Sequence, residues 1–325
     1  MTDKFRWGVI GPGRIARKFA SDLKAVEGFE LYAVASRTGA ENFVREFDVP
    51  VEHSSYQALV DDPQVDGVYI ATPHNFHFEQ ADLCLEAGKP VLCEKPLTVN
   101  AQQAASLIER SRKNKVFLME ALWSRYLPIY QAVRKLLDDG VIGMVLAIQS
   151  SFCFVANQDP AGRWLNPELA GGTLLDLGVY PIAISQWVIQ ANPVRVQSQA
   201  VLNSTGVDVL IAANLQYPSG AVSQFTSSLI HQARNDLGIH GSKGNIYLQE
   251  PFWEAARAIL DIDGKETVLH EPFRSQGFEY QIEEAVRCIR EGRLESPSMT
   301  HADTLSNLQV MDLIREQIGV KYPFE

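Results

Sequence analysis

Apolar and polar residues follow two different patterns along the chain, and the pattern changes near residue 122. Before that point, short apolar runs rich in β-branched residues alternate with longer segments of helical spacing. They predict strands at 6–11, 30–36, 65–71, 90–94 and 116–121, and helices at 14–26, 39–47, 76–87 and 99–113. Either Thr98 or Asn100 could cap the last helix. This alternation predicts a parallel sheet with helices on both faces.

Beyond residue 122, long strands of alternating apolar and polar residues dominate. One helix at 128–139 and one helical segment at 173–190 accompany strands at 144–155, 194–202, 207–217, 221–230 and 238–249, and helices at 278–291 and 301–318 close the chain. Turn sequences such as "YPSG" and "GSKG" indicate an antiparallel sheet. The sequence therefore predicts an α/β domain of the nucleotide-binding type at 1–122 and an α+β domain at 123–325.

Length and composition agree with two globular domains. The 325 residues are more than one hydrophobic core usually serves, and 46% hydrophobic with 21% charged residues is ordinary for a soluble protein. The net charge of −10 argues against nucleic acid or an anionic membrane as a partner.

Cysteine use and the chain start suggest a location. Cys84, Cys93, Cys153 and Cys288 are widely spaced, which indicates free thiols in a reducing compartment. No apolar run approaches the roughly 18 residues that a membrane span needs. The first strand begins so near residue 1 that we expect no signal peptide, and hence a cytoplasmic protein.

A glycine-rich turn follows the first strand in "VIGPGRIARKFA". Gly11, Gly13 and Ala16 form the pattern G-x-G-x-x-A, and Arg14 and Ile15 lie within it. Glycines at such a turn let the backbone approach a pyrophosphate, which binds at the N-terminus of the next helix. The turn after the first strand therefore predicts a dinucleotide site, with a plain tight turn as the alternative.

The end of the second strand indicates which dinucleotide binds. NAD enzymes usually place an acid there for the ribose hydroxyls, whereas this chain has Ser36, Arg37 and Thr38. A guanidinium binds a phosphate group bidentately, so these residues fit the 2′-phosphate of NADP and favour NADP over NAD. Arg14 could add a second positive group. The alternative is that Arg37 only covers surface.

The third strand ends in "ATPHNFHFEQ", at the sheet edge where such folds bind ligands. Ala71, Thr72, Pro73, Asn75 and His77 are the cofactor-binding candidates of this loop. Two histidines lie three residues apart, but nothing nearby would complete a coordination shell, so we expect no metal.

In the stretch "VLCEKPLTVN" a lysine follows directly after a strand that looks buried. Proline fixes its own φ and moves the preceding residue away from helical backbone, so Lys95 should be extended and firmly aimed. An ordinary exposed ion pair followed by a turn is the alternative for an isolated Glu-Lys-Pro.

Taken in order, five motifs give a resemblance that covers nearly the whole chain. "GPGRIA", "ATPHNFH", "CEKPL", "MEALWSRYLP" and "GGTLLDLGVYPI" resemble the Gfo/Idh/MocA oxidoreductase family, named for glucose–fructose oxidoreductase and inositol dehydrogenase. "LWSRYLP" and "GFEYQIEEAVRC" resemble its branch of dimeric dihydrodiol dehydrogenases and NADP-linked D-xylose 1-dehydrogenases. The resemblance implies a Rossmann domain followed by a domain with an open-faced, mostly antiparallel sheet.

The resemblance also implies roles for particular residues. Glu94 and Lys95 match the family's Glu-Lys-Pro signature, whose lysine lies at both nicotinamide and substrate. Asp176 and Tyr180 match two polar positions that face the cofactor, where many sugar dehydrogenases have histidine at the second position. Trp123 and Arg125 would line the cofactor and substrate site. Further aromatic candidates for the substrate are Phe154, Trp253 and Phe278, although ordinary packing explains each of them equally well.

These residues suggest a proton transfer that accompanies hydride transfer. A free tyrosine is a poor base at neutral pH, but a nearby ammonium stabilises the tyrosinate, so Lys95 would assist Tyr180. Asp176 lies four residues before Tyr180 and would orient a substrate hydroxyl or the lysine. The substrate would be a sugar or a cyclic diol. Two alternatives are a non-catalytic regulator of the same fold and a sugar-processing enzyme that recycles bound nicotinamide.

The strands of the second domain lead to an expectation about assembly. "VLIAANLQY" and "AVSQFTSSLI" carry many apolar residues, and helices would cover only one side of their sheet. These strands carry too many apolar residues for both faces of the sheet to be solvated, so the uncovered face needs a partner. We therefore expect a homodimer that pairs two such sheets.

Overall fold

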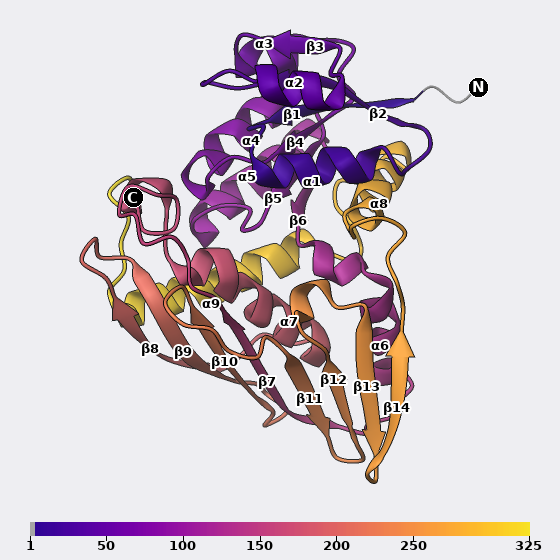
Figure 1. The fold of residues 1–325 in the computed structure, drawn as a ribbon, viewed down its shortest axis with the longest axis vertical. Coiled ribbons are helices and arrows are strands. Elements are labelled where there is room, and N and C mark those ends of the chain that lie inside the picture. The colour runs from indigo at the N-terminus through magenta and orange to yellow at the C-terminus, as the bar shows by residue number, and fades with distance from the viewer. Residues whose placement is uncertain (1–3) are drawn as a thin grey trace. The chain divides into compact units, whose positions relative to one another are not determined.

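The computed structural model describes residues 4–325, and the chain in it forms two compact units (Figure 1). The first unit contains the chain up to Trp123 together with Arg274–Leu305, and the second contains Ser124–Phe273 and Ser306–Glu325. Residues 1–3, on which the expectation about a signal peptide depends, lie outside the described residues.

The first unit contains a six-stranded sheet in the order β3-β2-β1-β4-β5-β6, with every neighbouring pair parallel. Its strands are β1 (Phe5–Ile10), β2 (Phe29–Ala35), β3 (Val51–His53), β4 (Gly67–Ile70), β5 (Val91–Glu94) and β6 (Leu118–Ala121). Its connecting helices are α1 (Arg14–Leu23), α2 (Glu41–Phe47), α3 (Tyr56–Asp61), α4 (His77–Glu86) and α5 (Ala101–Asn114). The predicted Rossmann architecture is confirmed.

Local signals explain most of these elements. β4, β5 and β6 are buried along their whole length, as continuous apolar runs predict for a parallel sheet. Asn100 caps α5, because its side chain accepts a hydrogen bond from the Gln103 amide at 2.9 Å. The sequence prediction missed β3 and α3, which have three and six residues and are too short to show a clear period.

The segment 274–305 lies in the first unit, although the predicted boundary assigned everything after residue 122 to the second. Asp22 of α1 accepts hydrogen bonds from Ser275 Oγ at 2.7 Å and the Phe278 amide at 2.7 Å. Further along, the Leu118 amide donates to Leu294 O at 3.0 Å. These contacts hold the loop before α8 (Glu279–Arg290) and the chain after it against the Rossmann sheet.

The second unit contains an eight-stranded sheet in the order β14-β13-β12-β11-β7-β10-β9-β8. Its strands are β7 (Val145–Cys153), β8 (Arg195–Leu202), β9 (Asp208–Gln216), β10 (Val222–Ser228), β11 (Leu237–Gly241), β12 (Asn245–Leu248), β13 (Arg257–Ile262) and β14 (Lys265–His270). Only β7 and β10 pair in parallel among these neighbours. The expectation of a mostly antiparallel sheet is confirmed.

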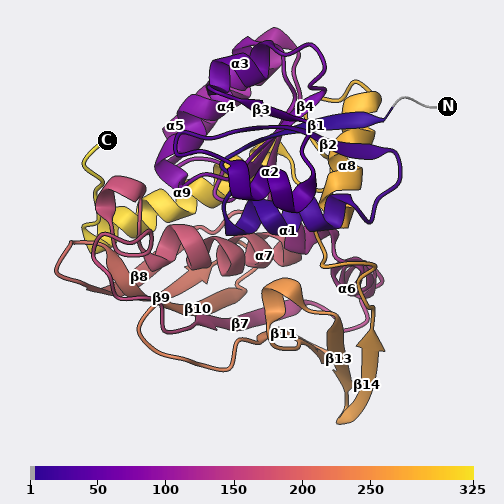
Figure 2. The ribbon, with the colours of Figure 1, turned by 45° about the horizontal axis from the view of Figure 1, so that its top comes forward.

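Helices cover one face of this sheet. The second unit contains α6 (Pro128–Asp138) and α7 (Val179–Ile189), and α9 (His301–Ile318) runs from the first unit into it. Figure 2 shows α7 lying across the sheet beside β7 and β10. Alternate residues of β9 are buried, including Val209, Ile211 and Leu215, whereas Asn214 and Gln216 are exposed.

The apolar residues of β9 therefore point to the covered face, which contradicts the premise that the uncovered face needs a partner to cover apolar residues. The opposite face carries a row of amides, in which Gln149 Nε2 donates to Gln224 Oε1 at 3.2 Å and Gln224 Nε2 donates to Asn214 Oδ1 at 2.9 Å. The two faces differ because apolar and polar residues alternate regularly along these strands, and alternate side chains of a strand point to opposite faces of the sheet.

One stretch, Pro167–Ile189, is long and apolar enough to resemble a membrane span, which the sequence prediction overlooked. Its glycines, Thr173 and Asp176 break up the apolar residues, so no uninterrupted run stands out. In the fold, 89% of its most apolar window is buried, which is the environment of a core helix.

Candidate active site

The glycine-rich turn after β1 has the geometry of a phosphate-binding loop. Gly11 has a φ of +86°, and a Cβ there would lie 2.6 Å from the Thr72 side chain. A Cβ at Gly13 would meet nothing within 4 Å, so the backbone is open to a ligand at this point. Gly13 is the N-cap of α1 and contributes no side-chain hydrogen bond, which leaves the amides of the first turn for an anion. Ile15 is half-buried and Ala16 is buried.

The turn after β2 presents two hydroxyls and an exposed guanidinium. Ser36 Oγ accepts a hydrogen bond from the Thr38 amide at 3.2 Å. The guanidinium of Arg37 lies 4.0 Å from the centre of the Phe76 ring. Within residues 4–325, the structure gives no acid partner to Arg37 or to the exposed Arg14. Both cations are thus available to a phosphate.

The loop after β4 faces the glycine-rich turn, and its residues have different surroundings. Ala71 is buried, Pro73 is exposed, and Thr72 Oγ1 donates to Gln80 Oε1 at 2.6 Å. Asn75 Oδ1 is buried and has no hydrogen-bond partner among the described residues, so it is suited to accept a hydrogen bond from a ligand.

His77, predicted to bind cofactor, holds two backbone segments together. Its ring is fully buried, and Nδ1 lies 2.9 Å from Pro96 O while Nε2 lies 2.9 Å from Thr72 O. The imidazole therefore links the loop after β4 to the turn that follows Lys95. Each ring nitrogen faces a backbone carbonyl oxygen, so neither is directed toward a ligand.

Buried acids hold the Glu94-Lys95-Pro96 turn on both sides. Glu94 accepts a hydrogen bond from Tyr69 Oη at 2.5 Å, and Glu120 accepts one from the Leu97 amide at 3.1 Å. Glu120 also accepts from Thr304 Oγ1 at 2.8 Å, which joins the turn to α9. Tyr69 and Glu120 were not predicted. Their polar side chains within the apolar runs "VYI" and "LMEA" were the available signal.

Trp123 and Phe278, two of the aromatic candidates, meet in the first unit. Their ring centres are 4.9 Å apart, and Lys18 Nζ lies 3.8 Å from the centre of the Trp123 ring. Both rings are at least 96% buried. Arg125 belongs to the second unit, where it is buried and its Nη2 donates to Ala183 O of α7 at 3.3 Å.

Asp176 and Tyr180 lie on one helical segment of the second unit. A π-helical turn, Leu174–Gly178, runs directly into α7, and such turns are frequent at functional sites. Both side chains are about 95% buried. Asp208, the first residue of β9, accepts a hydrogen bond at 2.7 Å from the amide of Leu174, where this segment begins. Burial raises the pKa of this carboxyl to about 7.

Asp176 has a partner that sequence reasoning missed. Arg163 Nη2 donates to Asp176 Oδ1 at 2.9 Å, and the Arg163 guanidinium stacks on Trp164 at 4.3 Å from its ring centre. The two residues are thirteen positions apart and joined by an irregular loop, so no periodic pattern pointed to the pair.

Aromatic rings connect Tyr180 to the Arg163 loop. The Phe152 ring lies 5.7 Å from Tyr180 and stacks on Trp253 with ring centres 3.4 Å apart. Phe154 lies 6.4 Å from Phe152, between ring centres, and meets Trp164 edge-on at 5.2 Å. Trp253 and Phe154, the remaining two candidates, thus belong to one aromatic set on the second unit.

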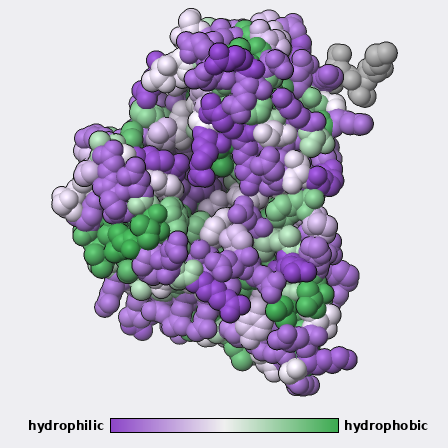
Figure 3. Space-filling model, in the orientation of Figure 1, coloured by the Kyte–Doolittle hydropathy of each residue, from purple (hydrophilic) through white to green (hydrophobic). Residues whose placement is uncertain are grey.

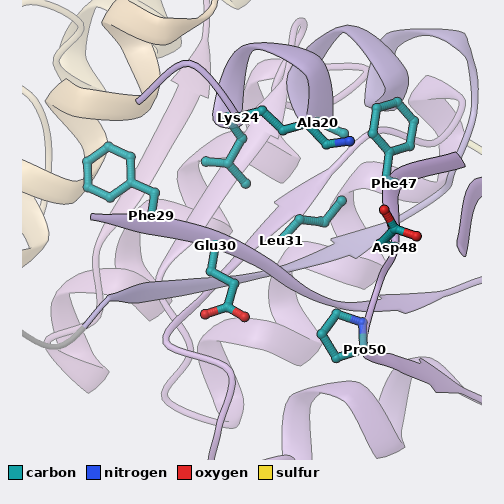
Figure 4. Close-up of a pocket in the computed structure, with 9 residues that line it drawn as sticks. Ala20, Lys24, Phe29, Glu30, Leu31, Phe47, Asp48 and Pro50 are labelled. Atoms are coloured by element: carbon teal, nitrogen blue, oxygen red, sulfur yellow. The ribbon is translucent and has the colours of Figure 1, made fainter. Parts of the chain in front are cut away.

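A separate groove of about 210 Å³ lies elsewhere on the first unit (Figure 4). It is lined by Ala20, Leu23, Lys24, Phe29, Glu30, Leu31, Phe47, Asp48 and Pro50. None of these is a candidate site residue, so the groove is not the dinucleotide site.

Comparison with known proteins places these features in one family. Residues 5–122 match the oxidoreductase family with an NAD-binding Rossmann fold, and residues 130–247 match the GFO/IDH/MocA C-terminal domain. The chain therefore belongs to the Gfo/Idh/MocA oxidoreductases, as the motifs suggested.

Whole-length relatives narrow the similarity. The chain is 36% identical to trans-1,2-dihydrobenzene-1,2-diol dehydrogenase of Xenopus laevis, over 98% of this chain and 99% of the relative. It is 34% identical to the Mus musculus protein of that name, over 98% of each chain.

Two solved structures have the same fold along nearly the whole chain. Aldose-aldose oxidoreductase from Caulobacter crescentus, complexed with glycerol, has a TM-score of 0.88 at 25% identity and covers 97% of each chain. KijD10, a 3-ketoreductase from Actinomadura kijaniata in complex with NADP and TDP-benzene, has a TM-score of 0.86 at 28% identity and covers 97% of this chain and 98% of its own.

Proposed function

We propose that the chain is an NADP-dependent dehydrogenase that oxidises a hydroxyl of a sugar or a cyclic diol. In this proposal Tyr180 is the general acid/base, and Lys95 stabilises its ionised form. The observation that carries this is the presence of a phosphate-binding turn and of a Glu94-Lys95-Pro96 turn held by buried acids in a family of oxidoreductases. Four buried, unpaired cysteines support a reducing, cytoplasmic setting.

NADP is supported by the two exposed cations near the turn. Arg37, with Ser36 and Thr38, would hold the 2′-phosphate, and Arg14 would add positive charge. Gly11, Gly13 and the amides of α1 would hold the pyrophosphate, and Asn75 would accept a hydrogen bond. KijD10 was solved with NADP, which agrees with this choice.

A bound nicotinamide would supply the hydride acceptor for the carbon that carries the reacting hydroxyl. Tyr180 takes the hydroxyl proton, and the Lys95 ammonium stabilises the tyrosinate that is needed for this step. Asp176 accepts a hydrogen bond from the substrate and so orients it.

The relatives support both substrate types. The dihydrodiol dehydrogenases are named for a cyclic diol, and the aldose-aldose oxidoreductase is named for sugars. The partly exposed aromatic rings of the second unit suit either ring.

A substrate screen tests the proposal directly. The purified chain would be mixed with NADP⁺ or NAD⁺ and a set of pentoses, hexoses and trans-cyclic diols, and reduction of the nicotinamide followed by absorbance. We expect substrate-dependent reduction with NADP⁺ at lower cofactor concentration than with NAD⁺. If no member of the set reduces either cofactor, the proposed activity is wrong, and a non-catalytic role is favoured instead.

The name of the Caulobacter crescentus relative favours a second candidate, in which one sugar is oxidised and another reduced by the same bound nicotinamide. Cofactor that stays with the protein through purification, and turnover of two sugars without added NADP⁺, would establish it.

A further inference from the structure

Arg163 has hydrogen-bonding capacity that the fold does not use. An arginine has five N–H donors, and within residues 4–325 the structure gives the Arg163 side chain one hydrogen bond, from Nη2 to Asp176. Its side chain is 47% exposed, whereas that of Asp176 is 7% exposed. The remaining donors are therefore open to a ligand.

The guanidinium is also held in a defined orientation. The ion pair with Asp176 fixes one edge, and stacking on Trp164 fixes the plane. Trp164 in turn packs edge-on against Phe154. A cation that is fixed in this way loses little freedom when it binds, which distinguishes it from an arginine that only covers surface.

The pair offers an acceptor beside a donor. Asp176 Oδ1 and Arg163 Nη2 are 2.9 Å apart, and Tyr180 is four residues along the same helical segment. A substrate with oxygens on two neighbouring carbons could place its reacting hydroxyl at Tyr180, while the hydroxyl on the next carbon accepts a hydrogen bond from Arg163 and donates one to Asp176. A substrate with a single hydroxyl would leave the Arg163 donors without this partner.

We propose that Arg163 determines specificity by donating a hydrogen bond to the substrate oxygen on the carbon next to the reacting one. The substrate would therefore carry oxygens on adjacent ring carbons. This inference rests on the proposed function in taking Asp176 and Tyr180 as the substrate side of the site.

Two simple probes test this inference, trans-cyclohexane-1,2-diol and cyclohexanol, which differ by one hydroxyl. Binding of each to the full-length protein with NADP⁺ would be followed by tryptophan fluorescence, and kcat/KM measured where turnover occurs. We expect the wild type to prefer the diol. In Arg163→Met this preference should fall by roughly tenfold to a hundredfold, the effect of losing a hydrogen bond to a charged group. Arg163→Lys should restore part of it.

A matched control is Arg234→Met, which removes another exposed arginine of the same unit that pairs with an acid, Asp236. It should keep the wild-type preference. General damage to the fold would weaken both probes equally, so the ratio isolates recognition of the second oxygen by the Arg163–Asp176 pair.

Two outcomes would overturn the inference, namely a wild type that does not distinguish the probes and an Arg163→Met variant with unchanged preference. Failure of the proposed activity looks different, because the binding ratio is measurable even if no probe reduces NADP⁺.

Discussion

The Tyr180 ring is packed against Phe152 and is 5% exposed, so removing its hydroxyl should leave the packing in place. Tyr180→Phe should lower turnover by about 10²–10⁴, the usual range for general acid–base catalysis. NADPH affinity, measured by fluorescence titration, should barely change. Near-normal turnover in Tyr180→Phe would mean that another group carries the proton.

Lys95→Met should lower turnover by a comparable factor, because the tyrosinate would lose the ammonium that stabilises it. The two losses should not add in the double variant, since both act on one proton transfer. The wild-type oxidation rate should rise with pH as Tyr180 ionises, and this rise should be absent in Tyr180→Phe. Losses that add fully would show that the two residues act in separate steps.

Arg37→Ala should weaken NADP binding by about tenfold or more, because a hydrogen bond between a charged group and phosphate contributes on the order of 1.5–3 kcal/mol. The affinity for NAD should stay the same, so the ratio of NADP affinity to NAD affinity should fall. Calorimetry with both cofactors measures this. Lys115→Ala, which changes an exposed cation at the far end of α5, is the control. Equal affinity of the wild type for both cofactors would contradict the prediction.

For single residues, the sequence indicates which residue types form the site, but it says much less about which residues they contact. Glycine spacing and the Lys-Pro pair were visible because backbone constraints are local. The two carbonyls that His77 joins belong to different loops, and the Asp176 partner lies in an irregular loop. No local pattern records such contacts.

Among the elements, the segment with Asp176 and Tyr180 depends on a buried carboxyl at its start. Asp208 has a usual pKa of 3.8 that burial raises to about 7 in the fold. Between these values the unfolded chain has lost the proton while the folded chain keeps it. Each pH unit in this window therefore lowers the free energy of unfolding by about 1.4 kcal/mol.

Asp208→Asn lacks this dependence. The free energy of unfolding of the wild type, relative to that of the variant, should therefore fall by up to about 4 kcal/mol between pH 4 and pH 7. Urea denaturation of both proteins at several pH values measures the difference, and other titrating groups cancel. A difference that does not change with pH would show that the buried carboxyl ionises normally.

Elements with a strong period were predicted, and those with a short or turn-based signal were not. The predicted helix at 301–318 coincides with α9. The β13–β14 hairpin was missed although its turn contains Asp263-Gly264, with both residues at positive φ. Such an Asp-Gly pair is a known hairpin signal, so the sequence itself carries the evidence for this turn.

For the whole molecule, the homodimer stays a prediction, with a revised reason. The uncovered sheet face is mostly polar, but Val155, Val201, Leu202 and Ile230 are each at least 40% exposed. Figure 3 shows apolar surface gathered over the β8–β9 end of the sheet. Light scattering at micromolar concentration should give twice the mass of one chain.

A charge at the centre of the amide row should separate the two copies, if they pair through this face. Gln224→Lys should therefore give a monomer, since its side chain lies between Asn214 and Gln149. Gln102→Lys, on an exposed position of α5 in the first unit, is the control. A wild type with the mass of one chain would contradict the prediction.

The return of residues 274–305 to the first unit has a consequence for synthesis on the ribosome. Asp22 and Glu120 are made early, but their partners Phe278 and Thr304 emerge only after most of the chain has been translated. The unit that begins first must therefore be completed late, and until then Asp22 lacks its hydrogen bonds from Ser275 and Phe278, and Glu120 lacks the one from Thr304. A fragment of residues 1–123 should lack a cooperative melting transition by circular dichroism, and joining 274–305 to it through a flexible linker should restore one.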